Sequence, residues 1–469
     1  MKVLLLAWSA SGQDNYSYYP PIHQAYLAAA LREAGHEVRM FDFCDDFSKY
    51  DRVVRRAADY APDVVGYTVF TPYITLTHRI HTAMREALPN AVFVAGGGHA
   101  SCCREEILEQ FPGLDYAIAG EAEHSFVQLV GAIAGRGDAE MESISGLTWT
   151  RGGELVLNER TAPPQDLDAL AMPARDLLEE YYNDKMYWHF GAPGAVDMIV
   201  TSRGCAFDCG FCFKVETSCR FRSPDNVLEE LEAIRSRGIR DIDVMDDSFT
   251  LKRARAVEIL ERIIENRMDL RLKIRSRVNA VDPDLLDLCK RAGVRKIVYG
   301  VESGSQTMLD AMNKKTTVDM NLHAIRITRQ AGIVPVADIM IGMPGETPET
   351  IEETNRFLAE EKPVVTSVPV LYPLPATPVW KQAEREGTLR GAWTVGGKPP
   401  WVQLPWARSK YDIALYSVDM TRRLHRNPGW LYEVARTFGP GVRSRHIKFA
   451  ARQMARSVKK KFARKPKAA

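Results

Sequence analysis

Short apolar runs alternate with amphipathic, helix-like stretches along most of this 469-residue chain, and this alternation limits the possible folds more than any other feature. Strand-like runs that alternate with helical stretches predict parallel strands joined by crossover helices. Between Thr161 and Arg175 the sequence TAPPQDLDALAMPAR is rich in proline and shows no sustained period, which is typical of an interdomain linker. We therefore predict two α/β domains.

The first alternation predicts an N-terminal, doubly wound, Rossmann-like domain over residues 1–150. The continuous runs at 64–65 and 92–94 indicate strands that are covered on both faces. In such sheets ligands bind beyond the carboxyl ends of the strands. The residues that follow these ends are Thr68, Gly96, Gly97, Gly98, His99, Ser101, Gly120 and Glu121.

The second alternation begins at Asp197 and contains six strand–helix units, fewer than the eight that close a full barrel. The strand-like runs are DMIVTSR, IDVMDD, LRLKIRSR, KIVYGVES, PVADIMIG and VTSVPVLYP. We predict a linker over residues 151–190, a partial (β/α)6 TIM-like barrel over 191–378, and a helical C-terminal region over 379–469.

Three cysteines crowd into eight residues directly after the first strand of this barrel. In TSRGCAFDCGFCFK, three residues separate Cys205 from Cys209, and two separate Cys209 from Cys212. Thiolates are the usual ligands of iron–sulfur clusters, and three of them leave one iron of a 4Fe-4S cluster open. The alternatives are a zinc ion with Cys219 as fourth ligand, or free cysteines. Zinc sites usually show paired C-x2-4-C elements, which are absent here.

The segment CAFDCGFC resembles the CxxxCxxC signature of radical S-adenosylmethionine (radical SAM) enzymes, including the aromatic Phe211 before the last cysteine. The resemblance implies that the open iron binds S-adenosylmethionine. An electron from the cluster then yields methionine and a 5'-deoxyadenosyl radical, which takes a hydrogen from the substrate. It also implies an electron donor such as flavodoxin or ferredoxin.

Polar residues follow the next strand ends and are candidates to hold S-adenosylmethionine. They are Asp246, Asp247, Arg277, Glu302, Ser303 and Gly342. By the resemblance, Asp246 or Asp247 pairs with the methionine ammonium, Arg277 with its carboxylate and Glu302 with the ribose hydroxyls. Gly342 lies in IGMPGET, which resembles the glycine-rich turn near the adenine. Each is also compatible with a helix cap or an ordinary turn.

The N-terminal domain resembles the cobalamin-binding domain that precedes the barrel in a subgroup of these enzymes. The matching segments are YYPPIHQAYLAAALREAGHEV, PDVVGYT, VAGGGHAS and DYAIAGEAEHSF. The resemblance implies cobalamin at the strand-end residues named above. The D-x-H-x-x-G loop is absent, so no histidine is assigned to cobalt, neither His23 nor His99. Ile22-His23-Gln24 replaces the usual Gly-Leu, and a bulky loop there crowds the cofactor face.

The last residues are strongly basic. Arg443 to Lys467 hold eleven of the 62 lysines and arginines and no acid, so the remainder carries 51 basic against 60 acidic groups. Apolar residues recur there at helical spacing, which favours either a basic amphipathic helix on an anionic membrane surface or a solvated tail. The tail has few aromatic residues between its basic ones, which argues against a nucleic-acid partner. Eight cysteines are too few for a disulfide scaffold, so we expect a cytoplasmic protein, with possible membrane contact through the tail.

These features predict a radical enzyme that acts on a small-molecule or lipid substrate in specialised metabolism or lipid modification. The leading hypothesis is cobalamin-dependent methylation of an unactivated carbon. The second keeps the radical but ends in dehydration, cyclisation or oxidation, with cobalamin absent or not methylating. The third is a zinc-stabilised binding protein without catalysis.

Overall fold

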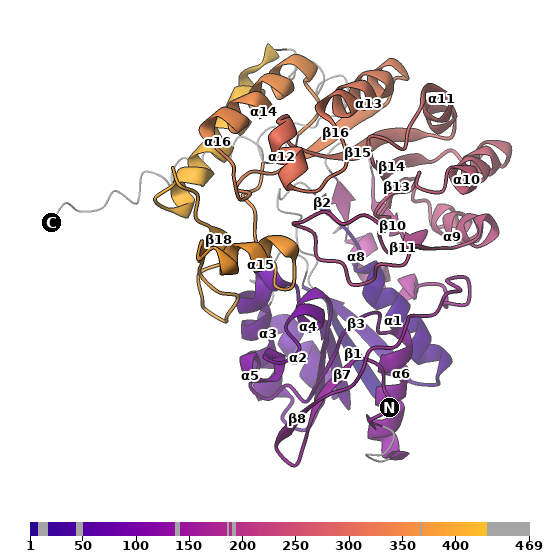
Figure 1. The fold of residues 1–469 in the computed structure, drawn as a ribbon. Helices are drawn as coiled ribbons and strands as arrows, with labels where there is room; N and C mark the ends of the chain where they lie inside the picture. Colours follow the sequence, from indigo (N-terminus) through magenta and orange to yellow (C-terminus); the bar gives the residue numbers. More distant parts are fainter. Residues whose placement is uncertain are drawn as a thin grey trace.

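The computed structural model describes residues 1–7, 17–43, 50–136, 141–184, 187–189, 194–365 and 368–428. Two α/β domains pack against each other, and Figure 1 shows the first (indigo to purple) below the second (magenta to orange). The predicted fold class, a Rossmann-like domain followed by an open barrel of parallel strands, is confirmed.

The first domain is built on a seven-stranded sheet of order β3-β1-β4-β5-β6-β7-β8. Its strands are β1 (Lys2–Ala7), β3 (Glu37–Asp42), β4 (Val64–Thr68), β5 (Val92–Gly96), β6 (Tyr116–Ile118), β7 (Leu147–Arg151) and β8 (Glu154–Leu157). The first five are parallel, while β7 and β8 form an antiparallel hairpin. The sheet thus ends at Leu157 rather than at the predicted boundary of residue 150.

Helices cover both faces of this sheet, which explains the continuous apolar runs. Alternate residues of β1 belong to two separate cores, with Val3 and Leu5 in one and Leu4 and Leu6 in the other. Figure 1 shows helices flanking the sheet on both sides. These helices are α1 (Ile22–Glu33), α2 (Tyr50–Tyr60), α3 (Ile74–Ala87), α4 (Gly98–Cys102), α5 (Ile107–Gln110) and α6 (Glu123–Gly131).

The second domain contains five parallel strands in sequential order. They are β10 (Val196–Ile199), β13 (Asp241–Val244), β14 (Arg271–Ser276), β15 (Val294–Glu302) and β16 (Val334–Ile339). The predicted sixth strand is represented by two parallel bridges to residues of β16 and its end, Val336 to Val364 and Ile341 to Val370. The sheet is therefore an open, partial barrel over the described residues.

Four of the six described helices that follow these strands begin at side-chain caps. The helices are α9 (Pro224–Ser236), α10 (Arg253–Glu265), α11 (Pro283–Arg291), α12 (Gln306–Ala311), α13 (Val318–Gln330) and α14 (Pro348–Glu361). In α9, α11, α13 and α14, the caps Ser223, Asp282, Thr317 and Thr347 each accept a hydrogen bond from the third residue beyond, and proline occupies the first turn of three of these helices.

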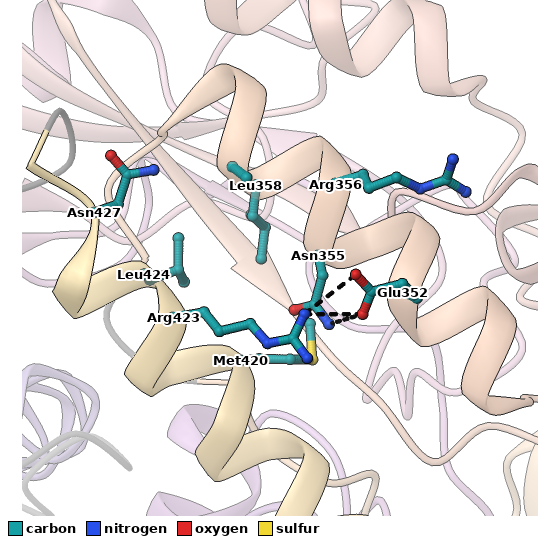
Figure 2. Close-up of a pocket in the computed structure, with 9 residues that line it drawn as sticks. Glu352, Asn355, Arg356, Leu358, Met420, Arg423, Leu424 and Asn427 are labelled. Atoms are coloured by element: carbon teal, nitrogen blue, oxygen red, sulfur yellow. Dashed lines mark hydrogen bonds and ion pairs between the residues drawn. The ribbon is translucent and has the colours of Figure 1, made fainter.

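Beyond the barrel, the described chain forms α15 (Pro378–Arg385), β17 (Leu389–Arg390), β18 (Trp401–Val402) and α16 (Lys410–Arg426). A small cavity lies between α14 and α16, where Arg423 pairs with Glu352 (Figure 2). None of its lining residues belongs to the cysteine segment. The basic tail lies outside the described residues. Within them, no helix has the length and apolar character needed to cross a membrane.

The segment predicted as a linker is packed between the two domains. It contains β8, a 3-10 turn (Arg175–Leu178) and α8 (Glu179–Asn183). The backbone N–H of Ala174 donates to Ala25 O at 3.0 Å. The hydroxyl of the fully buried Tyr187 donates to Asp42 Oδ2 at 3.0 Å. A single hydrophobic core spans both domains and this connecting segment, so they form one packed unit.

A buried carboxylate forms hydrogen bonds to all three parts of this unit. Glu230 of α9 is 1 % exposed and accepts hydrogen bonds from Arg175 (2.6 Å), Arg222 and Tyr26. Arg175 also donates to Asp197 Oδ2 at 3.0 Å, at the start of the barrel sheet. Tyr26 belongs to the first domain, Arg175 to the connecting segment and Glu230 to the barrel, so a single side chain joins all three.

Replacing Glu230 by alanine is expected to destabilise the protein by about 3–5 kcal/mol, because the buried guanidinium group of Arg222 loses its carboxylate partner and that of Arg175 keeps only Asp197. Urea unfolding followed by circular dichroism measures the loss. Glu232→Ala is the matched control, since Glu232 lies on the same helix and pairs with Arg235 at the surface. That change should cost less than about 1 kcal/mol. Equal losses in the two variants would contradict the assignment.

Candidate active site

The cysteine loop, residues 204–219, is closed at its base by two short antiparallel strands, β11 (Ser202–Arg203) and β12 (Arg220–Phe221). Gly204 has φ +85°, and a Cβ there would lie 2.1 Å from Ser218 O, so only glycine fits this turn. The buried Asp246 carboxylate accepts hydrogen bonds from Thr201 N (2.6 Å), Thr201 Oγ1 (2.5 Å) and Ser202 N (3.0 Å). Asp246 therefore fixes the start of the loop.

Hydrogen bonds from the 312–313 segment of the barrel and from α15 hold the tip of the loop. Gly210 N donates to Met312 O at 2.8 Å, and Gly210 O accepts from Val379 N of α15 at 2.9 Å. Asn313 Nδ2 donates to Asp208 O at 2.7 Å. Within the loop, Lys214 Nζ donates to Phe207 O at 2.9 Å. The loop has a defined shape before any ligand binds.

The three thiols lie within electrostatic range of one another. Cys205 and Cys209 are partly exposed and Cys212 is exposed at the mouth of the loop. Although the residue as a whole is exposed, desolvation of its thiol by the surrounding loop, followed by the charges of Cys209, Cys205 and Asp247, raises the pKa of Cys212 to about 11, and Lys314 opposes that rise. Since thiolates are the ligating form, a bound cation must draw these protons off.

Among the described residues, the loop thiols do not form a compact ligand group for a single zinc ion. Sulfurs on one zinc lie at most about 4.6 Å apart, twice the Zn–S bond length. In the described part of the chain, no group of three ligand atoms within 4.8 Å of one another includes any cysteine of this loop, Cys219 among them. Cys219 instead donates to Gly204 O at 3.5 Å. The donor set of three spread thiols fits a 4Fe-4S cluster.

Three of the predicted S-adenosylmethionine residues are placed around the cysteine loop with polar atoms facing it. Asp247 is exposed and close enough to raise the pKa of Cys205 and Cys212. The Arg277 guanidinium stacks on the Phe207 ring at 3.7 Å and donates to Lys314 O at 2.6 Å. The Glu302 carboxylate accepts from Lys314 Nζ at 2.8 Å. Phe211 packs on the core, with Lys314 Nζ 5.8 Å from its ring centre.

Glu302 sits in a strained conformation. Its φ is +64°, a left-handed value that is uncommon for a residue with a side chain, at a register shift between β15 and β16. Such strain persists only where the surroundings impose it, and it concentrates at functional sites. Here the hydrogen bond from Met340 N to Glu302 O and the ion pair with Lys314 impose it.

The other predicted partners lie below the surface of the site. Asp246 is fully buried and its oxygens are engaged as described. Ser303 is 1 % exposed and hydrogen-bonds to Thr354 Oγ1 at 3.0 Å. Gly342 is buried with φ +97°, and its N–H donates to the Glu346 carboxylate. Burial raises the pKa of Glu346 to about 7. These three residues support the loops that carry the site.

The loops that follow the strands of the first domain also contact one another. Gly97 has φ +91°, and a Cβ there would lie 2.4 Å from Thr68 Cγ2, so these two strand-end loops approach closely. Ser101 Oγ accepts from Gly120 N at 3.0 Å. Gly98 faces open space and Gly96 has its nearest neighbour at 3.8 Å, which leaves backbone accessible at this edge. His99, in contrast, is completely buried.

An ion-pair cluster connects this edge to the base of the cysteine loop. Glu121, predicted at the cofactor edge, pairs with Arg203 (2.9 Å) and with Arg220. Glu123 pairs with Arg203 at 2.6 Å. Desolvation, followed by the charge of Arg203, lowers the pKa of His23, which couples this residue electrostatically to the ion-pair cluster.

Sequence reasoning missed a charged patch on the inner face of the barrel. Asp243, Lys273 and Asp338 lie on one face of the sheet. Lys273 Nζ donates to Asp243 at 2.7 Å and to Tyr19 OH of the first domain at 3.2 Å. Arg275 donates to Asp243 at 2.7 Å. We name these four barrel-face residues and Tyr19 the inner-face cluster.

A signal for this cluster existed in the sequence. In RLKIRS of β14, charged residues alternate with apolar or small ones, and Leu272, Ile274 and Ser276 are buried while the charged residues between them are not. A parallel barrel strand with charges at every second position has a polar interior. Burial and the nearby Glu302 raise the pKa of Asp338 to about 6, although its side chain remains open to solvent.

Two family models match the chain. Residues 14–130 match the B12 binding domain and residues 199–358 match the radical SAM superfamily. The first match covers the strand-end edge described above, and the second covers the cysteine loop and the barrel strands from Ile199 onward.

Curated relatives match most of the chain. An uncharacterised methyltransferase from Pyrococcus horikoshii is 30% identical over 372 residues, 78% of this chain and 78% of its own length. An anaerobic magnesium-protoporphyrin IX monomethyl ester cyclase from Cereibacter sphaeroides is 30% identical over 384 residues, 80% of this chain. The aligned part spans only 62% of that cyclase.

Among solved structures, the radical S-adenosylmethionine methyltransferase TsrM from Kitasatospora setae has a similar fold. Its TM-score is 0.69 at 22% identity, over 89% of this chain and 82% of that chain. At this identity the likeness supports the two-domain fold.

Cys212→Ala should abolish the cluster, because two thiolates cannot hold the three-ligand site, whereas Cys219→Ala should leave it intact. Iron and sulfide content, with the visible absorption of anaerobically reconstituted protein, measures the outcome. Colourless protein with stoichiometric zinc, lost in Cys219→Ala, would contradict the cluster and support the mononuclear alternative.

Proposed function

Because this chain belongs to the radical SAM enzymes that carry an N-terminal cobalamin-binding domain, we propose that it methylates an unactivated carbon of a small-molecule substrate. The observation that carries the proposal is the contact between the two cofactor regions. Glu121, at the strand-end edge of the first domain, pairs with Arg203 and Arg220 at the base of the cysteine loop. Methyl transfer needs both cofactors to reach one substrate carbon.

In this proposal Cys205, Cys209 and Cys212 hold a 4Fe-4S cluster with one open iron. When S-adenosylmethionine is bound there, the cluster supplies the electron that generates the 5'-deoxyadenosyl radical. Asp247 binds the methionine ammonium, and Glu302 accepts from the ribose hydroxyls. Arg277 and Lys314 supply positive charge for the carboxylate. Lys314 O already holds Arg277 and Glu302 already holds Lys314, so little reordering is needed.

Cobalamin is assigned to the accessible edge formed by Thr68, Gly96, Gly98 and Ser101. Its donor set fits a large planar cofactor, since backbone at Gly96 and Gly98 is uncovered and hydroxyls stand beside it. The side chain of His99 is completely buried, so it does not reach a cofactor at this accessible edge. Bound there, methylcobalamin would supply the methyl group.

The inner-face cluster favours a charged or zwitterionic substrate over an apolar lipid. Lys273 and Arg275 share the carboxylate of Asp243, and Tyr19 reaches them from the first domain. Burying an apolar chain against these charges would strip their solvation without new partners, which is costly. A substrate carboxylate, phosphate or amine would instead pair with them.

Anaerobic reconstitution with S-adenosylmethionine and a reductant should produce 5'-deoxyadenosine, and Cys212→Ala should produce none. With methylcobalamin and substrate, the product should gain the mass of one methylene, as measured by mass spectrometry. Failure of the wild-type protein to form 5'-deoxyadenosine would refute the radical step.

A second function keeps the radical but ends in ring formation or oxidation, and the 30% identity to a cyclase favours it. Formation of 5'-deoxyadenosine with a product that lacks the added methylene would support this function and contradict methylation. Absence of corrinoid from extracts of the purified protein would also contradict methylation, since methylation requires it.

The inner-face cluster leads to a prediction about the substrate. Metabolite fractions that raise 5'-deoxyadenosine formation above the substrate-free level should be water-soluble and ionic, and Lys273→Met should weaken that response. Arg271→Met is the matched control, because Arg271 lies on the same strand but pairs with Asp241 near the opposite end. Stimulation by an organic-solvent-soluble lipid fraction would contradict a charged substrate.

A further inference from the structure

A second group of metal-ligating side chains lies in the first domain, outside the cysteine loop. His99, Cys102 and Cys103 each offer a ligand atom, and these atoms lie within 4.8 Å of one another. The two sulfurs are 3.5 Å apart. His99 and Cys103 are buried, and Cys102 is partly exposed. All three come from α4 and the residue that follows it, directly after β5.

The imidazole of His99 is oriented as in a metal ligand. Its Nε2 lies 2.7 Å from Gln110 Oε1, an acceptor, so Nε2 carries the proton and donates. Nδ1 is then unprotonated, and it faces Thr71 Oγ1 at 3.3 Å. The same hydroxyl lies 3.8 Å from Cys102 Sγ. Metal-binding histidines generally donate their second ring N–H to an oxygen acceptor in this manner.

The donor chemistry selects the metal. Two sulfurs 3.5 Å apart subtend an angle of about 100° at an ion with a Zn–S bond of about 2.3 Å, close to tetrahedral. Two thiolates and a neutral imidazole cancel the charge of a divalent ion, which matters in a largely buried site. Hard cations such as magnesium and calcium prefer oxygen ligands and are excluded.

We propose that His99 Nδ1, Cys102 Sγ and Cys103 Sγ bind a zinc ion, with the Thr71 hydroxyl beside the fourth coordination position. Binding releases the two thiol protons and leaves the oxidation state of the sulfurs unchanged. The ion would join α4 to the turn after β4, which contains Thr71. Gln110 extends the connection, because its Nε2 donates to Trp393 O in the C-terminal region at 3.3 Å.

Zinc analysis of the full-length protein tests the site. After incubation with one equivalent of zinc and desalting under anaerobic conditions, the wild type should retain about one zinc per chain, and Cys102→Ala and Cys103→Ala should lose it. Cys289→Ala is the matched control, since Cys289 is a buried thiol in α11, and it should retain zinc. Iron content should be unchanged in all four proteins, which separates this site from the cysteine loop.

The role of Gln110 gives a second measurement that does not remove a ligand. Gln110→Leu deletes the acceptor for Nε2–H and should weaken zinc binding about 10- to 100-fold in chelator competition. Gln110→Glu keeps an acceptor and should restore it. Retention of zinc by both cysteine variants, no zinc in the wild type, or unchanged affinity in Gln110→Leu would overturn the proposal. So would a wild-type mass lower by two hydrogens, which indicates a disulfide between Cys102 and Cys103.

Discussion

The buried carboxylate of Glu230 is the contact on which the arrangement of the two domains depends. It accepts hydrogen bonds from Arg175 of the connecting segment, Arg222 of the barrel and Tyr26 of the first domain. An uncompensated charge in this position would be costly, so the three parts have one low-energy arrangement. That arrangement brings the strand-end edge of the first domain against the base of the cysteine loop, where Glu121 meets Arg203.

The carboxylates near the site fall into two groups, one buried and one accessible, and the two groups have different roles. Asp246 and Glu346 are buried and accept backbone N–H groups, so they hold the loops that begin at Thr201 and Gly342. Asp247 and Glu302 keep oxygens near the mouth of the site. In the neighbouring pair Asp246 and Asp247, the first carboxylate supports the loop and the second remains exposed for the proposed ligand. Glu302, whose backbone has the strained positive φ, belongs to the second, accessible group of carboxylates.

The interior of the barrel carries a charged patch. Asp243, Lys273 and Arg275 neutralise one another in part, and Tyr19 contributes a hydroxyl from the first domain. The patch therefore depends on the docking of two domains as well as on the barrel strands. A substrate that binds there would contact residues far apart in the sequence, and its charge would decide its fit.

The sequence alone determined the two α/β domains and the three-cysteine loop that is proposed to bind the cluster, because both depend on local signals: apolar periodicity and the spacing of three thiols in one loop. It also placed Asp247, Arg277 and Glu302 at strand ends. Only the tertiary structure decided that Asp246, Ser303 and Gly342 are buried supports, that residues 151–184 are packed rather than loose, and that Lys314 pairs with Glu302. Burial and pairing between distant residues depend on how the elements pack, and no local pattern encodes them.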